Sequence, residues 1–354
     1  MVALPIVQLC LFGYAINTDV RHIPTVIVDR DHSAASRDLA RSLEATGFYD
    51  LVGAAHDHGD VARAFAAGVA KVALVVPARY SADLLGGRAP TLQLVVDGSD
   101  PQVVASATNT AAALVAARGA ELSVARSPAT HVAADGRLAR EPIRLEPLVW
   151  YNPELRTAVY VVPGLVGVIL TMTMVMLTAM AIARERERGT LEQLIVSPVR
   201  RVELIVGKIL PYVSIGYVQM TLVLLVGALV FRVPIVGSAA LLYGIAFVFI
   251  AANLALGLFF STLAETQQQA MQLSFFFLLP NMLLSGFMFP FEAMPEPARW
   301  LGQVLPLTHF LRVVRGVALK GSSFADVWHE LLWLGTILLS LILVASLRFH
   351  KKLA

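Results

Sequence analysis

The sequence has little cysteine and little charge. Cys10 is the single cysteine among 354 residues, which excludes an intramolecular disulfide framework and a cysteine metal cluster. Charged residues make up 15% of the chain and apolar residues 57%, whereas a typical soluble domain carries about 25% charge. Internal repeats and low-complexity segments are missing too. These values exclude a wholly soluble protein.

Catalytic and nucleotide-binding motifs are also missing. No G-x-S-x-G or H-E-x-x-H pattern occurs. Gly207-Lys208 lacks both the following Ser/Thr and the glycine five residues earlier that a phosphate-binding loop requires. His56 and His58 are only two residues apart in a polar stretch, which indicates a solvated loop more than a metal site. We therefore expect no enzyme activity, no metal and no cofactor bound by this chain.

Long apolar runs are what the sequence does contain, and a bilayer span takes about 20 such residues. The run 157–183 has no charged residue. Four more runs follow, at 209–231, 239–264, 270–291 and 327–347. Residues 1–16 form a shorter sixth run, which we interpret as the outer part of a first span that starts upstream of Met1. The sequence therefore predicts about six spans, the first of them shortened.

Basic residues in the short loops indicate the orientation, because cytoplasmic loops are enriched in Lys and Arg. The 184–208 loop and the C-terminal tail together carry nine, and the loops on the opposite side carry five. We therefore expect the 184–208 loop in the cytoplasm and residues 17–156 outside. Basic residues beside apolar runs favour a membrane surface, and not nucleic acid, as the partner.

Residues 17–156 alternate between strand-length apolar runs and helix-like stretches. The expected strands are 25–29, 72–76, 92–97 and 143–150. Ser33 is expected to cap a helix that ends at Gly47, and Pro101 to open a long helix that ends near Gly119. This alternation predicts a mainly parallel sheet.

The expected fold class is an α-helical polytopic membrane protein with an inserted extracytoplasmic α/β domain. Residues 1–16 would be the first span, residues 17–156 the extracytoplasmic domain, and residues 157–354 a five-span permease domain.

The cytoplasmic segment 184–198 reads RERERGTLEQLIVSP. Thr190 followed by Gln193 is a capping-box pattern, and Leu191 and Leu194 share one helical face. Proline ends the helix, because it pushes the residue before it out of the α region. The pattern predicts a short helix, 190–197, that lies across the membrane surface. The alternative is an ordinary charged end of a span.

Residues 184–198 resemble the E-R-E-x-G-T-L-E-x-L-x-x-S-P signature of ABC transporter permeases of the type-2 export class. Residues 283–295 and 305–316 are also similar to that family, and residues 12–20 resemble its multidrug-efflux-like subgroup with a large extracytoplasmic domain after the first span. The resemblance implies that helix 190–197 is a coupling helix, which inserts into a separate ATPase subunit that binds ATP and Mg²⁺. The implied interface residues are Glu185, Glu187, Gly189, Thr190, Leu191, Glu192, Leu194 and Pro198.

The resemblance further implies that residues 287–320 form a re-entrant pair of short helices closing an outer gate. The implied gate residues are Gly286, Phe287, Phe289, Pro290, Pro306 and His309. The alternative is a plain extracellular loop with aromatic residues at the membrane interface.

Uncharged polar residues within the spans are candidates for lining a transport path. They are Thr171, Thr173, Gln219, Asn253 and Asn281. The alternative is that they form hydrogen bonds between helices, as such residues usually do in membranes.

The implied function is the permease subunit of an ATP-driven exporter that moves drugs or lipid-like compounds outward across the cell inner membrane. The implied partners are an ABC ATPase, a second permease copy or relative, and, for this subgroup, a periplasmic adaptor and an outer-membrane channel. One alternative is an ion-driven secondary transporter, which generally needs ionisable residues near the bilayer midplane; none occurs there. The other is a membrane-anchored sensor, for which five further spans are more than an anchor needs.

Overall fold

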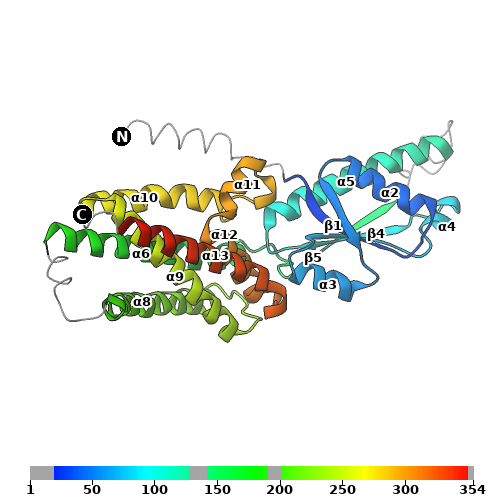
Figure 1. Ribbon diagram of the computed structural model, residues 1–354. Coiled ribbons are helices and arrows are strands. Elements are labelled where there is room, and N and C mark those ends of the chain that lie inside the picture. The colour runs from blue at the N-terminus through cyan, green and yellow to red at the C-terminus, as the bar shows by residue number, and fades with distance from the viewer. Residues whose placement is uncertain (1–19, 127–141, 190–200, 350–354) are drawn as a thin grey trace. The chain divides into compact units, whose positions relative to one another are not determined.

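The computed structural model describes residues 20–126, 142–189 and 201–349. The chain separates into two compact units, one of Thr18–Arg156 and the other of Met1–Asn17 with Thr157–Ala354. Figure 1 shows a sheet flanked by helices in the first unit and long helices in the second.

The first unit is built on a five-stranded sheet in the order β2-β1-β3-β4-β5. The strands are β1 (Ile23–Asp29), β2 (Tyr49–Ala54), β3 (Val72–Val76), β4 (Thr91–Asp97) and β5 (Arg144–Trp150). The neighbours of β1 are both parallel to it and β5 is parallel to β4, whereas β3 and β4 are antiparallel. The predicted mainly parallel sheet is thus confirmed.

The two edge strands, β2 and β5, are more exposed than the strands between them. β2 was not predicted, because Asp50 and Gly53 interrupt its apolar run and only Tyr49 is fully buried. β5 is largely exposed and carries Pro147, which lies opposite Leu94 of β4. Proline is tolerated here because one side of an edge strand has no partner to bond.

The helices of this unit are α2 (Ala34–Ala45), α3 (His58–Ala66), α4 (Tyr80–Leu85) and α5 (Pro101–Arg126). Ser33 caps α2 as predicted: its side chain accepts from the Ser36 backbone N–H, and the Ser36 side chain accepts from that of Ser33. The predicted end of α5 at Gly119 is wrong, because the helix continues to Arg126. A Cβ on Gly119 would lie 3.2 Å from the Pro142 ring, so glycine permits a close approach here.

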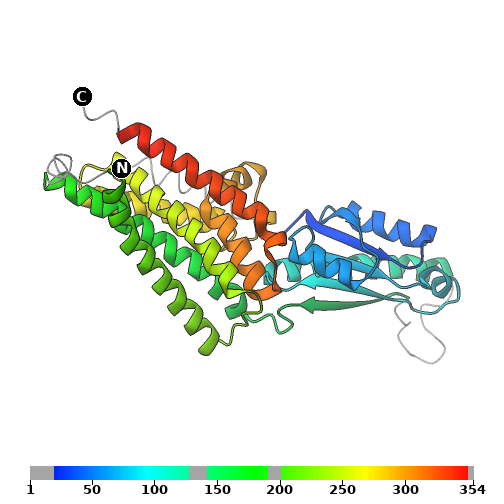
Figure 2. The same cartoon turned by 60° about the horizontal axis from the view of Figure 1, so that its bottom comes forward.

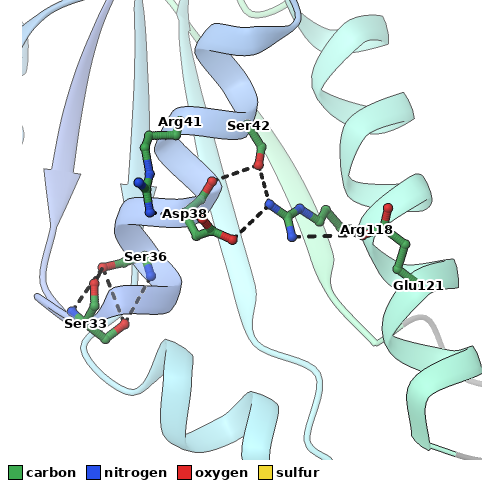
Figure 3. Close-up of polar contacts among 7 residues, drawn as sticks. All are labelled: Ser33, Ser36, Asp38, Arg41, Ser42, Arg118 and Glu121. Carbon is green, nitrogen blue, oxygen red and sulfur yellow. Dashed lines mark hydrogen bonds and ion pairs between the residues drawn. The ribbon is translucent and has the colours of Figure 1, made fainter.

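A polar cluster links α2 to α5 (Figure 3). The Arg118 guanidinium of α5 lies 3.2 Å from the Asp38 carboxylate of α2 and also donates to the Ser42 hydroxyl. Asp38 also receives a hydrogen bond from Arg41, 3.1 Å away on its own helix. Because these groups are half-exposed, each ion pair contributes about 1 kcal/mol or less.

We expect Arg118→Ala to loosen α2, since this change removes the pair that joins two helices. The opening free energy of α2 should fall by about 1 kcal/mol, measured as faster hydrogen exchange of its amides in the full-length protein. Arg41→Ala is the matched control, because Arg41 pairs with Asp38 only within α2. Equal acceleration in both variants would contradict the assignment.

The second unit contains α6 (Thr157–Glu187), α8 (Arg201–Leu229), α9 (Ala239–Leu263), α10 (Gln267–Leu284), α11 (Glu296–Gln303), α12 (Pro306–Arg315) and α13 (Phe324–Phe349). Two short turns, η1 (Phe291–Ala293) and η2 (Gly316–Lys320), flank α11 and α12. α6 is central and packs on α8, α9, α10 and α12, and Figure 2 follows these helices along the unit.

Among the described residues, four helices are long and apolar enough to cross a membrane. They are Thr157–Glu187, Leu210–Leu229, Ala239–Leu263 and Phe324–Leu347. The run predicted to span at 270–291 differs: its helix, α10, has 18 residues, begins with three glutamines and ends at Leu284. α10 ends there because Gly286 adopts a left-handed conformation, with φ of +84°, which glycine accommodates without strain.

Candidate functional site

The C-terminal end of α6 is joined to the connection between α9 and α10. Arg186 Nη1 donates to the carbonyl oxygens of Ser261, at 3.2 Å, and Ala264, at 2.8 Å. These carbonyls lie at the C-terminal end of α9, where backbone oxygens lack helical partners and attract cations. Arg186 therefore fixes the end of α6 against the end of α9.

Glu187 makes the corresponding link to α10. Its Oε1 accepts a 2.8 Å hydrogen bond from the backbone N–H of Gln267, and its Oε2 accepts one from the Gln267 side-chain amide. Gln267 is the first residue of α10, so the carboxylate lies at the positive end of that helix. Arg184 Nε completes the group with a 2.9 Å bond to Gln267 Oε1.

The predicted coupling residues fall partly outside the described structure. Glu185 is half-buried near the end of α6, and Gly189 follows the helix with a φ of +66°. The others, namely Thr190, Leu191, Glu192, Leu194 and Pro198, lie outside the described residues. The coupling helix 190–197 therefore stays a prediction, whereas the hydrogen bonds of Glu187 to Gln267 are a feature that sequence reasoning missed.

A charged cluster at the other end of the unit joins α12 to α13. His309 Nδ1 lies 2.5 Å from Glu330 Oε2, and His309 Nε2 lies 2.8 Å from the Gln303 carbonyl oxygen. Arg312 Nη1 donates to Glu330 Oε1 at 3.1 Å. The His309 ring is 1% exposed and stacks on Trp333. Glu330 thus contacts both His309, a predicted gate residue, and Arg312. In the sequence, Glu330 stands out only as an acidic residue within an apolar run.

A second cation of α12, Arg315, contacts the end of α10 and the start of α6. Its Nη1 donates to the Gly286 carbonyl at 3.0 Å, and its guanidinium carbon lies 4.2 Å from the centre of the Tyr160 ring. The Tyr160 hydroxyl in turn donates to the Phe287 carbonyl at 3.0 Å. Two predicted gate residues are therefore bound to α6 and α12 through their backbone oxygens.

The remaining predicted gate residues lie in the predicted re-entrant segment, 287–320. Phe289 packs on the cluster of Leu283, Leu284, Met294 and Ala298. Pro290 precedes η1, and Pro306 is the buried first residue of α12. The stretch thus contains two short helices, α11 and α12; their re-entry into a membrane stays a prediction.

The polar residues within the helices divide into two groups. Gln219 Nε2 donates to Thr173 Oγ1 across α8 and α6 at 3.3 Å, which supports the interhelical alternative for this pair. Thr171, Asn253 and Asn281 are at most 2% exposed. Counting only described residues, Thr171 Oγ1, Asn253 Oδ1 and the whole Asn281 amide have no hydrogen-bond partner. A path-lining role for this second group stays a prediction.

The family model and the similar proteins found by comparison all belong to transporters. The model of a family described as ABC-2 family transporter protein matches residues 1–347. The chain is 30% identical to the probable multidrug ABC transporter permease YbhR of Escherichia coli K12 over 326 residues, covering 92% of this chain and 86% of the relative. It is 31% identical to the inner membrane transport permease YhhJ of the same organism over 336 residues, covering 93% and 86%.

Proposed function

Because the chain belongs to the ABC-2 family of transporter proteins and is the transmembrane subunit of an ABC exporter, we propose that it moves drugs or lipid-like compounds outward across the cell inner membrane. The observation that carries this proposal is the family match over nearly the whole chain. The cargo class is suggested by relatives named multidrug permeases. ATP and Mg²⁺ would bind to a separate ABC ATPase, and no cofactor to this chain.

The proposed mechanism uses α10 as a rigid connection. Movement of the ATPase would displace the segment after Gly189, and the Glu187 link would pass that displacement to Gln267 at the start of α10. At about 1.5 Å per residue, the 18 residues of α10 extend about 27 Å. The far end of α10 reaches Gly286, whose carbonyl binds Arg315 of α12. Displacement at one end would therefore change the contacts of the predicted outer gate.

The proposed assembly pairs two permeases, identical or related, with two ATPase subunits, because about six spans per chain are few for a complete pathway. Exposed apolar side chains on α8 and α13 leave surfaces for lipid or for the second permease. The ion-driven alternative is less favoured, because the charged and histidine residues of the described spans lie near helix ends. Residues 184–187 lie at the end of α6, and Asp326, His329 and Glu330 lie within the first two turns of α13.

The proposed function is tested by co-expressing the chain with its ATPase and measuring ATP-dependent uptake of fluorescent drugs into inside-out membrane vesicles. We expect uptake only when both proteins are present and the ATPase retains its phosphate-loop lysine. Uptake without nucleotide or without the second polypeptide would contradict the proposal.

We also propose that the sheet unit is extracytoplasmic and docks a periplasmic adaptor that leads to an outer-membrane channel. Deleting residues 20–150 should then abolish cross-linking to the adaptor, whereas co-purification with the ATPase should persist because the predicted coupling segment is retained. Unchanged cross-linking in the deletion variant would reject the docking role.

A further inference from the structure

Arg315, in the second unit, uses only part of its hydrogen-bonding capacity. Nη1 donates to Gly286, and Tyr160 stacks on the guanidinium. Nε and Nη2, however, are buried and have no hydrogen-bond partner among the described residues. No described carboxylate forms an ion pair with Arg315, whereas Arg312, one turn earlier, pairs with Glu330.

The unused groups form a recognisable binding edge. Nε and Nη2 lie on the same side of the planar guanidinium, and together they can donate two parallel hydrogen bonds to a carboxylate or a phosphate. Arg315 is half-buried, but enclosing two of its guanidinium nitrogens without acceptors is unfavourable, and the contact with Tyr160 compensates for it only in part. In this conformation Arg315 therefore lacks acceptors for Nε and Nη2 among the described residues, and a bound anion would supply them in another conformation.

We propose that Arg315 is a specificity-determining residue that binds a carboxylate or phosphate group of the cargo through Nε and Nη2. This inference rests on the proposed export function and adds the chemical class of the cargo. Binding requires α12 to move away from α6, because the two nitrogens are enclosed in the conformation described here.

The surroundings of Arg315 suit such an exchange. A Cβ on Gly164 of α6 would clash with the Phe287 ring, at 2.7 Å, and would make ordinary contact with Arg315 Nη2, at 3.5 Å, so glycine here lets Phe287 pack closely on α6 beside the guanidinium. The bond to Gly286 lies directly after α10, so a shift of α10 that breaks this bond would also free Nη1. Release of the gate and capture of an anion would then occur together.

The test compares one acid with its neutral ester. The full exporter, permease with ATPase, is placed in phosphatidylcholine nanodiscs, and the binding of dansyl-phenylalanine and of its methyl ester is measured by fluorescence anisotropy with and without a non-hydrolysable ATP analogue. In one of these two states the wild type should bind the acid at least about tenfold more tightly, as expected for charge-assisted hydrogen bonds. Arg315→Gln should reduce this ratio to about one. Arg315→Lys keeps the charge but loses the two parallel N–H donors of the guanidinium, so it should retain part of the ratio.

Arg312→Gln is the matched control, because that guanidinium already has Glu330 and its loss should leave the acid-to-ester ratio unchanged. Repeating the titration with phosphatidylglycerol distinguishes the source of the anion: if this lipid abolishes the acid preference, a lipid phosphate occupies Arg315, and if it does not, the group belongs to the cargo. Both results support anion binding.

Equal wild-type affinities for acid and ester in both nucleotide states, including no binding of either, would overturn the inference. So would an Arg315→Gln variant that weakens both ligands equally, since that is the effect of a purely structural contact. Both results are binding measurements and do not depend on ATP-driven uptake of neutral drugs. Failure of that uptake would contradict the proposed function and not this inference.

Discussion

Glu187→Arg is expected to reduce ATP-driven export roughly tenfold or more, while the protein still inserts in the membrane. Substitutions in an element that couples two distant sites commonly have effects up to this size. The change removes the acceptor of the Gln267 N–H and places a further positive charge at the positive end of α10, beside Arg184. Export into inside-out vesicles, normalised to the amount of permease, measures the effect.

Two variants control for this prediction. Glu187→Gln keeps an oxygen for Gln267 but loses the charge, so it should retain intermediate export. Glu265→Arg introduces the same charge change at an exposed residue of the same connection, whose carboxylate makes no hydrogen bond to the described part of α6, and export should be preserved. Wild-type export by Glu187→Arg, or an equal loss in Glu265→Arg, would remove Glu187 from the coupling route. The predicted interface residues also include Glu192, whose change to arginine should likewise uncouple export if helix 190–197 contacts the ATPase.

Glu330→Ala is expected to lower both the thermal stability and the export activity. It leaves His309, which is 1% exposed, and Arg312 without their shared carboxylate. Breaking a fully buried pair costs about 3–5 kcal/mol, and partial exposure of Glu330 reduces this to about 2–3 kcal/mol. The melting temperature of the purified protein in detergent, followed by tryptophan fluorescence, measures the loss.

A control variant and a variant that should restore stability can both be made on α12 and α13. Asp326→Ala removes the acceptor of Ser323 in the first turn of α13 and should cost only about 1 kcal/mol. The triple variant Glu330→Ala, His309→Leu and Arg312→Leu should recover much of the melting temperature, because replacing all partners leaves no unpaired buried charge. A Glu330→Ala protein as stable as wild type would show that the cluster does not hold α12 to α13.

Features that depend on neighbouring residues in the chain were predicted well. The Ser33 cap and the strand 72–76 follow from local patterns and agree with the structure. Local signals failed at two places: β2 pairs with the edge of the sheet that β1 offers, and α5 continues past Gly119 to Arg126.

The candidate site divides in the same way. The predicted gate residues rest on a family motif alone, since burial and periodicity do not distinguish Phe287 from other apolar residues. The roles of Glu330 and Arg315 were missed because their partners are 21 and 29 residues away in sequence. No spacing rule connects such positions, so only the folded structure brings them together.

Pro147 in the edge strand β5 has a consequence for crowded membranes. An incoming strand extends a sheet by pairing with a continuous row of backbone donors, and proline interrupts this row near the middle of β5. Strand pairing between the sheet units of adjacent copies is therefore disfavoured along β5.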